Sequence, residues 1–218
     1  MSKRRLLLAT TNQGKVREIK NLLRGLCLRI ESLKDYPQYG SYKETSRTFA
    51  ENSCGKSLFY SQQYPGLVLA EDSGLEVDAL AGAPGVYSAR FSGAGATDEK
   101  NIKKLLRLLT EVPEKNSKAR FVCVATLSSG GKIIKTFKGT VRGLITPLPR
   151  GANGFGYDPV FFYPPLKKSF AELTASEKNQ VSHRGRALRK VREFLEKYLS
   201  KNSTPPTRTK RQKPQANK

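Results

Sequence analysis

The sequence has little cysteine, almost no histidine and no long apolar run. Its three cysteines, Cys27, Cys54 and Cys123, are far apart and odd in number, which excludes a readable disulfide framework or zinc knuckle and favours the reducing cytoplasm. The single histidine, His183, excludes a metal site built from several histidines. The apolar run near the N-terminus is too short for a signal peptide, and no stretch approaches membrane-spanning length. We therefore expect a soluble cytoplasmic protein with no membrane partner.

Acidic residues are also scarce, since 18 of them face 40 lysines and arginines and leave a formal net charge of +22. A strongly basic chain favours a polyanionic partner or substrate. Several of the few acids nevertheless lie close together in the sequence: Glu44, Glu51, Glu71, Asp72, Glu76 and Asp78. An acidic cluster in a phosphate-seeking protein indicates a bound cation. A basic RNA-binding protein, in which these acids are incidental, is the alternative.

The length of 218 residues suits one sizeable α/β domain, which we place at residues 1–200. Apolar patterns predict strands at residues 6–9, 67–70 and 160–163, a hairpin of residues 119–128 and 132–141, and helices starting near residues 15, 48, 97 and 182. The tail, residues 201–218, has six basic residues and no acid. We expect it to be disordered and able to contact nucleic acid non-specifically.

The chain is organised around residues 69–90, where Glu71 and Asp72 follow a short apolar run. We expect Ser73 and Gly74 to turn the backbone there, so that the two carboxylates end a strand. Hard oxygen ligands of this kind suit Mg²⁺, whereas a solvated acidic turn is the alternative. Glu44 precedes a helix in irregular backbone and is free to be a second ligand.

Two loops have the character of ligand sites. Residues 10–15 link a strand to a helix, so unpaired amides at the helix N-terminus would attract an anion and Lys15 would add a charge. An Asn12 N-cap beside a solvated lysine is the alternative. The second loop, residues 150–158, has three glycines and offers Phe155 and Tyr157 as ring faces on which a base could stack.

Five separated blocks carry a family resemblance: TTNQGK at 10–15, ETSRTFAEN at 44–52, LAEDSGLEVDALAGAPGVYSAR at 69–90, GFGYDPVF at 154–161, and FAEL with EKNQVSHRGRAL within 170–188. In this order they resemble the inosine/xanthosine triphosphate pyrophosphatases, a family that removes noncanonical purine nucleotides. The resemblance covers about residues 5–199 and leaves the tail out. A pyrimidine-directed pyrophosphatase of similar fold fits the GFGYD and SHR blocks less well.

The resemblance implies a homodimeric α/β protein with a long mixed central sheet flanked by helices, and two lobes around an active-site cleft. It implies Mg²⁺-dependent hydrolysis of ITP, dITP or XTP to the monophosphate and pyrophosphate, with Asp72 as general base and with Glu44 and Asp72 as metal ligands. It implies substrate contacts at Thr10, Thr11, Asn12, Gln13, Gly14, Lys15, Lys56, Ser73, Phe155, Gly156, Tyr157, Asp158, Lys178, His183 and Arg184. Two positions depart from the family pattern, because Ser46 replaces a frequent glycine and Glu71 replaces an aspartate of many bacterial members.

Overall fold

The computed structural model describes residues 3–112 and 117–201, so the expectations for the tail beyond residue 201 lie outside the described residues. The strands are β1 (Arg4–Leu8), β2 (Leu28–Ser32), β3 (Leu67–Val77), β4 (Lys118–Ser129), β5 (Lys132–Ile145), β6 (Phe161–Tyr163) and β7 (Lys168–Ser169). The α-helices are α1 (Gln13–Leu22), α2 (Phe49–Ser61), α3 (Asp98–Thr110), α4 (Ala175–Val181) and α5 (His183–Lys201).

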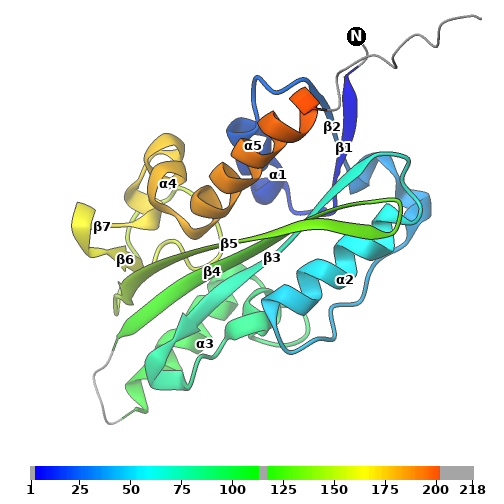
Figure 1. Ribbon diagram of the computed structural model, residues 1–218. Coiled ribbons are helices and arrows are strands. Elements are labelled where there is room, and N and C mark those ends of the chain that lie inside the picture. The colour runs from blue at the N-terminus through cyan, green and yellow to red at the C-terminus, as the bar shows by residue number, and fades with distance from the viewer. Residues whose placement is uncertain (1–2, 113–116, 202–218) are drawn as a thin grey trace, which may run out of the picture.

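The strands form one mixed sheet in the order β2-β1-β3-β4-β5-β6-β7, shown in Figure 1. β1 pairs in parallel with β2 and β3, and every later pairing is antiparallel. The three central strands are long, with 11, 12 and 14 residues. The predicted long mixed sheet with flanking helices is therefore confirmed, as is the hairpin, which the structure assigns to β4 and β5.

The turn predicted at Ser73 and Gly74 is wrong, because β3 continues through both residues to Val77. β4 pairs with β3 from Val68 to Val77, so the backbone stays extended. Gly74 has a packing role instead, since an added Cβ would lie 2.4 Å from Ser88 Oγ. The carboxylates consequently lie in the middle of a strand and not at its end.

One face of β3 has apolar residues at both ends and polar residues between them. Its apolar residues are Leu67 and Leu69, which pack in a cluster with α1 and α5, and Leu75 and Val77, which pack in a second cluster with α3. Glu71 and Ser73 lie between these pairs and point to the same face, because side chains alternate along a strand. The two apolar clusters thus leave a polar gap between them, with α1 and α5 on one side and α3 on the other.

The opposite face of the sheet is covered by α2, whose buried side is largely polar. Its buried polar residues are Asn52, Ser53, Lys56, Ser57 and Ser61. Two of them bond to β4: the hydroxyls of Ser53 and Thr126 are 2.8 Å apart, and Ser57 donates to Thr126 O at 3.1 Å. Small hydroxyl side chains let the helix approach the sheet closely while every polar group keeps a partner. This explains why α2 lacks an apolar stripe in the sequence.

β1 covers only the first part of the β3 edge. β1 pairs with β3 only as far as Leu69, after which the chain leaves the sheet and enters α1. Asn12 caps α1, with its Oδ1 accepting from the backbone N–H of Lys15 at 3.0 Å. Asn12 is therefore the N-cap, but the solvated lysine of that alternative is wrong, because Lys15 pairs with Glu71 of β3.

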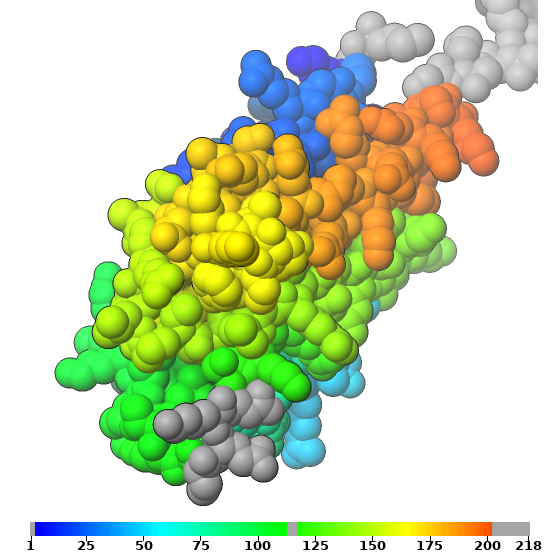
Figure 2. All heavy atoms as spheres, turned by 90° about the vertical axis from the view of Figure 1, so that its left-hand side faces the viewer, coloured from blue at the N-terminus to red at the C-terminus, as the bar shows by residue number. Residues whose placement is uncertain are grey.

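The segment with β6, β7 and α4 covers one side of the molecule. In the space-filling view from that side, it lies in yellow between the green residues that precede it and the orange helix α5 (Figure 2). Within the described residues, no helix combines the length and the apolar character needed to cross a membrane.

Candidate active site

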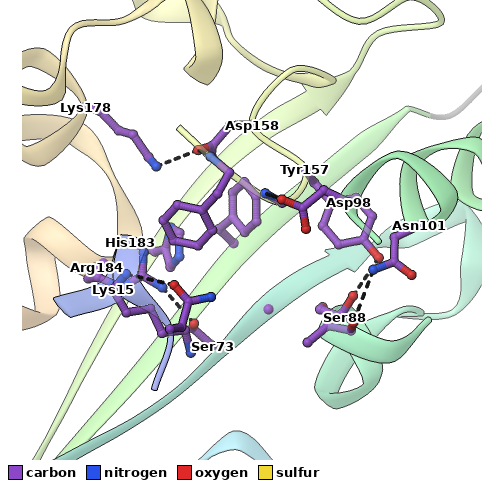
Figure 3. A pocket seen from close by; sticks show the side chains of 16 residues that line it. Lys15, Ser73, Ser88, Asp98, Asn101, Tyr157, Asp158, Lys178, His183 and Arg184 are labelled. Carbon is purple, nitrogen blue, oxygen red and sulfur yellow. Dashed lines mark hydrogen bonds and ion pairs between the residues drawn. The ribbon is translucent and has the colours of Figure 1, made fainter. Parts of the chain in front are cut away.

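A cavity of about 110 Å³ fills the polar gap on the α1 and α5 face of β3. Its lining residues are Asn12, Lys15, Ser73, Gly74, Ser88, Ala89, Asp98, Asn101, Phe121, Phe155, Gly156, Tyr157, Asp158, Lys178, His183 and Arg184. Figure 3 shows Lys15, Ser73, His183 and Arg184 on one side of the cavity and Ser88, Asp98, Asn101 and Tyr157 on the other. The cavity therefore lies between the two halves of the molecule, where a cleft between lobes is expected.

The glycine loop forms one wall of this cavity. Gly156 donates its backbone N–H to Asp98 Oδ2 at 2.7 Å, and Tyr157 donates its hydroxyl to Ser88 O at 2.9 Å. Both bonds tie the loop to the half of the molecule that holds α3. Tyr157 is buried in the second apolar cluster, so Phe155 is the ring with the freer face.

A chain of alternating charges runs from the N-terminus of α1 to the glycine loop. In order, its members are Lys15, Glu71, Arg184, Glu18, Lys178 and Asp158. Lys15 Nζ lies 3.1 Å from Glu71 Oε1, and Arg184 Nε lies 2.9 Å from Glu71 Oε2. Three cationic and three carboxyl side chains alternate, so each buried charge has opposite charges beside it.

Glu18 is the centre of this chain and was missed by sequence reasoning. Its Oε2 accepts from Arg184 Nη1 at 2.6 Å and its Oε1 from Lys178 Nζ at 2.9 Å. Lys178 Nζ also donates to Asp158 Oδ2 at 2.6 Å. The only signal in the sequence is that Glu18 is the one acidic residue of α1, one helical turn after Lys15.

The pKa values of the three carboxyl groups in this series of ion pairs shift in different directions. Burial raises the pKa of Glu71, but Arg184 and Lys15 outweigh it and hold that pKa well below its usual range. Burial also raises the pKa of Glu18, but the larger effect of Arg184 and Lys178 lowers it below its usual value. At Asp158 the effect of burial is larger than that of Lys178, so the pKa of that carboxyl is raised. Glu71 and Glu18 are therefore the firmly ionised members.

Phe155 contacts two of the cations that line the cavity. Lys178 Nζ is 4.7 Å and the Arg184 guanidinium carbon 5.3 Å from the centre of its ring. Gly14 lies under the ring, since an added Cβ at this position would be 2.7 Å from a Phe155 carbon. The glycine of the first loop thus makes room for the ring of the second.

His183 begins α5 and carries an unsatisfied buried atom. Its ring stacks on Phe121 with centres 4.6 Å apart and planes inclined by 13°. Within the described residues, Nδ1 is buried and has no hydrogen-bond partner. Burial lowers the pKa of His183 well below its usual value, so the ring is neutral. His183 lines the cavity, and a neutral imidazole has one nitrogen that donates and one that accepts.

Asp72 belongs to a second cluster on the α2 side of the sheet. Its Oδ2 accepts from Asn52 Nδ2 at 3.0 Å, and its Oδ1 accepts from the backbone N–H of Ser73 at 2.9 Å. Lys56, which lies one turn after Asn52, pairs with the carboxylate of Glu44. Burial and the negative charge of Glu44 raise the pKa of Asp72. Adjacent residues of β3 thus serve the two clusters.

Two neighbouring carboxylates of this kind fit a hard cation. Among residues 3–112 and 117–201, no group of three or more histidine, cysteine, aspartate or glutamate side chains could hold a metal ion. Mg²⁺ does not need such a group, since it keeps several waters and binds one or two carboxylates together with substrate phosphates. Glu44 and Asp72 are the residues that could hold it.

Most of the predicted substrate residues come together. Ten of them line the cavity: Asn12, Lys15, Ser73, Phe155, Gly156, Tyr157, Asp158, Lys178, His183 and Arg184. Four flank it in the loop and first turn before Lys15: Thr10, Thr11, Gln13 and Gly14. Lys56 lies instead with Glu44 and Asp72 in the second cluster. Residues that sequence reasoning missed include Glu18, Asn52, Ser88 and Asn101.

Known proteins are similar to this chain over most of its length. A dITP/XTP pyrophosphatase of Bacillus cereus is 46% identical over 200 residues, which are 91% of this chain and 98% of the relative. A HAM1 protein structure from Coxiella burnetii is 36% identical, with a TM-score of 0.83, 89% of this chain covered and 99% of the other. The Staphylococcus aureus Ham1 protein structure is 39% identical, with a TM-score of 0.80 and coverages of 89% and 100%. The sequence model of the Ham1 family matches residues 6–194, and the chain therefore belongs to that family.

Proposed function

We propose that the protein hydrolyses the noncanonical purine triphosphates ITP, dITP and XTP to the monophosphate and pyrophosphate. Such a reaction would keep deaminated purines out of DNA and RNA. The observation that carries the proposal is a cavity lined by buried charged side chains, next to both a helix N-terminus and a carboxylate pair. Relatives named dITP/XTP pyrophosphatase support it.

The triphosphate would bind at the N-terminus of α1. A triphosphate carries about four negative charges, which the first-turn amides of α1 and the Lys15 ammonium attract. Lys15 faces Glu71, and the same lysine also acts to lower the pKa of Asp72, so it lies near both clusters. The phosphates would therefore run from the cavity toward Asp72.

The base would occupy the cavity beside Phe155. Lys178 and Arg184 are held by carboxylates, which fixes the direction of their remaining N–H groups. These donors suit the 6-oxo group shared by hypoxanthine and xanthine. A 6-amino group would leave them unpaired in a buried site, which disfavours adenine.

Asp72 would act as general base on the α2 side. Its raised pKa makes it a stronger base than an exposed aspartate, and its two hydrogen bonds fix its orientation. Mg²⁺ held by Glu44 and Asp72 would neutralise phosphate charge and acidify a water. Asp72 would take a proton from the water that attacks the α-phosphorus, and pyrophosphate would leave.

A substrate panel of ITP, dITP, XTP, GTP, ATP and CTP with Mg²⁺ tests the proposal. We expect kcat/KM to be highest for XTP, ITP and dITP, lower for GTP, and lowest for ATP and CTP. Two mismatched buried groups at about 1–3 kcal/mol each predict roughly 10²- to 10⁴-fold discrimination against ATP. Arg184→Ala should narrow this preference more than it lowers activity on ATP. A flat profile, or release of orthophosphate, would contradict the proposal.

The competing function is RNA binding by a basic protein. It predicts strongly salt-dependent binding and no Mg²⁺-dependent turnover. The buried carboxyl groups of the site favour the enzyme, because Glu71 and Glu18 lie inside the site and not on an RNA-facing surface. Turnover in the panel decides between the two.

A further inference from the structure

Asn52 is fully buried in the first turn of α2, and both ends of its amide are in use. Its Nδ2 donates to Asp72 Oδ2 at 3.0 Å and lies 3.4 Å from Ser46 O. Its Oδ1 accepts from the backbone N–H of Ser46 at 3.1 Å. One side chain therefore joins Asp72 on β3 to the loop that carries Glu44, two residues before Ser46.

That loop depends on side chains for its position. Residues 40–46 form neither helix nor strand. Besides Asn52, two cations hold it, since Lys56 pairs with the Glu44 carboxylate and Arg90 Nη2 donates to Glu44 O at 3.1 Å. The Tyr60 hydroxyl also holds its first residues, by donating to Gly40 O at 3.1 Å and accepting from the Tyr42 N–H at 3.2 Å. Asn52 is the member of this set that also bonds to Asp72.

We propose that Asn52 is a positioning residue that fixes Asp72 and the Glu44 loop relative to each other. The inference rests on the proposed function, in which these two carboxylates act together. Each Asp72 oxygen accepts one N–H, from Ser73 or from Asn52, which fixes the plane of the carboxylate. Each oxygen keeps a second lone pair for a water or cation. A neutral amide orients the carboxylate without cancelling the charge that a cation would need.

Two variants separate the two bonds. Asn52→Leu has similar volume and lacks both the donor and the acceptor. Asn52→Asp keeps an acceptor for the Ser46 N–H but loses the donor to Asp72. Ser57→Ala is the matched control, because Ser57 is buried on the same helix and its hydroxyl donates to Thr126 O at 3.1 Å.

Three measurements are needed: steady-state kinetics on ITP at varied Mg²⁺, binding of a non-hydrolysable ITP analogue without Mg²⁺, and hydrogen exchange of residues 41–48. For Asn52→Leu we expect kcat to fall and the half-saturating Mg²⁺ concentration to rise, each by about 10- to 100-fold. Analogue binding should stay within about twofold of wild type, since the cavity is untouched. Exchange in residues 41–48 should become faster.

The other two variants should behave differently. Asn52→Asp keeps the acceptor for the Ser46 N–H, so exchange in residues 41–48 should stay slower than in Asn52→Leu. Turnover should still be lost, because the donor to Asp72 is replaced by a second carboxylate. Ser57→Ala should lose thermal stability without a change in Mg²⁺ dependence or in loop exchange.

Unchanged loop exchange in Asn52→Leu would overturn the inference, as would equal effects of Asn52→Leu and Ser57→Ala on Mg²⁺ dependence. If the wild-type protein releases no pyrophosphate, the proposed function fails by itself. Loop exchange then still tests the link between Asn52 and the Glu44 loop, because it needs no substrate.

Discussion

Glu71 and Asp72 are neighbours in the chain and have different surroundings, because successive side chains of a strand point to opposite faces. Glu71 meets Arg184 and Lys15, so it is ionised and is a poor proton acceptor. Asp72 meets Asn52 and Glu44, so its pKa is raised. At the scale of single residues, cations beside a buried carboxyl lower its pKa, whereas burial beside another carboxylate gives the raised pKa that the proposed general base needs.

Asp72→Asn tests this division of roles. The asparagine has the same shape, so we expect the variant to fold and to bind nucleotide. Loss of a positioned base should lower kcat by at least about 100-fold. Turnover of ITP at saturating Mg²⁺ is the measurement, and thermal unfolding is the control for folding. Wild-type turnover in this variant would place the base elsewhere.

Glu18→Gln tests the centre of the charge chain. The change leaves Arg184 with Glu71 and Lys178 with Asp158, but it removes the carboxylate that both cations share. We expect the free energy of unfolding to fall by about 2 kcal/mol, less than for a buried cation left with no partner.

The matched control is Glu196→Gln, which removes an exposed pair with Arg192 in α5 and should cost less than about 0.5 kcal/mol. Urea unfolding compares the two variants with wild type. Equal losses of unfolding free energy would show that the Glu18 ion pairs contribute no more to stability than a surface ion pair.

At the scale of elements, the sequence predicted those helices, caps and turns that depend on neighbouring residues. The helices predicted to start near residues 15 and 48, the Asn12 cap and the β4–β5 hairpin are confirmed, because each depends on residues close together in the chain. The predicted turn at Ser73 failed because long-range pairing with β4 overrides the turn tendency of Ser-Gly. Glu18 and Asn52 could not be identified, since Glu18 bonds to Arg184, 166 residues away, and Asn52 bonds to Asp72, 20 residues away.

His183, at the N-terminus of α5, should make the stability of the fold depend on pH. His183 has a lowered pKa in the folded protein, so only the unfolded chain takes up its proton when the pH falls below about 6.5. Its contribution to stability is therefore lost toward acid pH, by up to about 1.4 kcal/mol per pH unit.

Urea unfolding of wild type and His183→Gln between pH 7 and 5 measures this pH dependence of the unfolding free energy. The interval spans the ordinary histidine pKa of about 6.5. Other titrating groups contribute to both proteins, so the difference between the two slopes isolates His183. Parallel slopes would contradict a neutral buried imidazole.

At the scale of the whole molecule, the homodimer and the cytoplasmic location inferred from the resemblance and the composition remain predictions. A dimer predicts twice the chain mass of 24.2 kDa by sedimentation at the concentrations used for assay. A mass of one chain, with full activity, would show that each protomer holds a complete site.

The net charge of +22 comes mostly from residues outside the ion pairs of the site. The chain of ion pairs in the site contains as many carboxyl groups as cations, so it adds little to this total. The tail beyond residue 201 contributes five basic residues and no acid. Substrate hydrolysis and polyanion attraction should therefore be separable.

Deletion of residues 202–218 tests this separation. We expect kcat/KM for ITP to stay within about twofold of wild type, because every cavity residue precedes the deletion. Retention of single-stranded RNA should weaken, because five fewer cations release fewer counterions. The slope of log K against log salt concentration should become shallower by at most about 3.5, at roughly 0.7 for each phosphate that the tail no longer neutralises. Fluorescence anisotropy with a labelled oligonucleotide at several salt concentrations gives the slope. An unchanged slope would place the RNA-binding charge on the folded body, and a joint loss of activity and assembly would make the tail part of the fold.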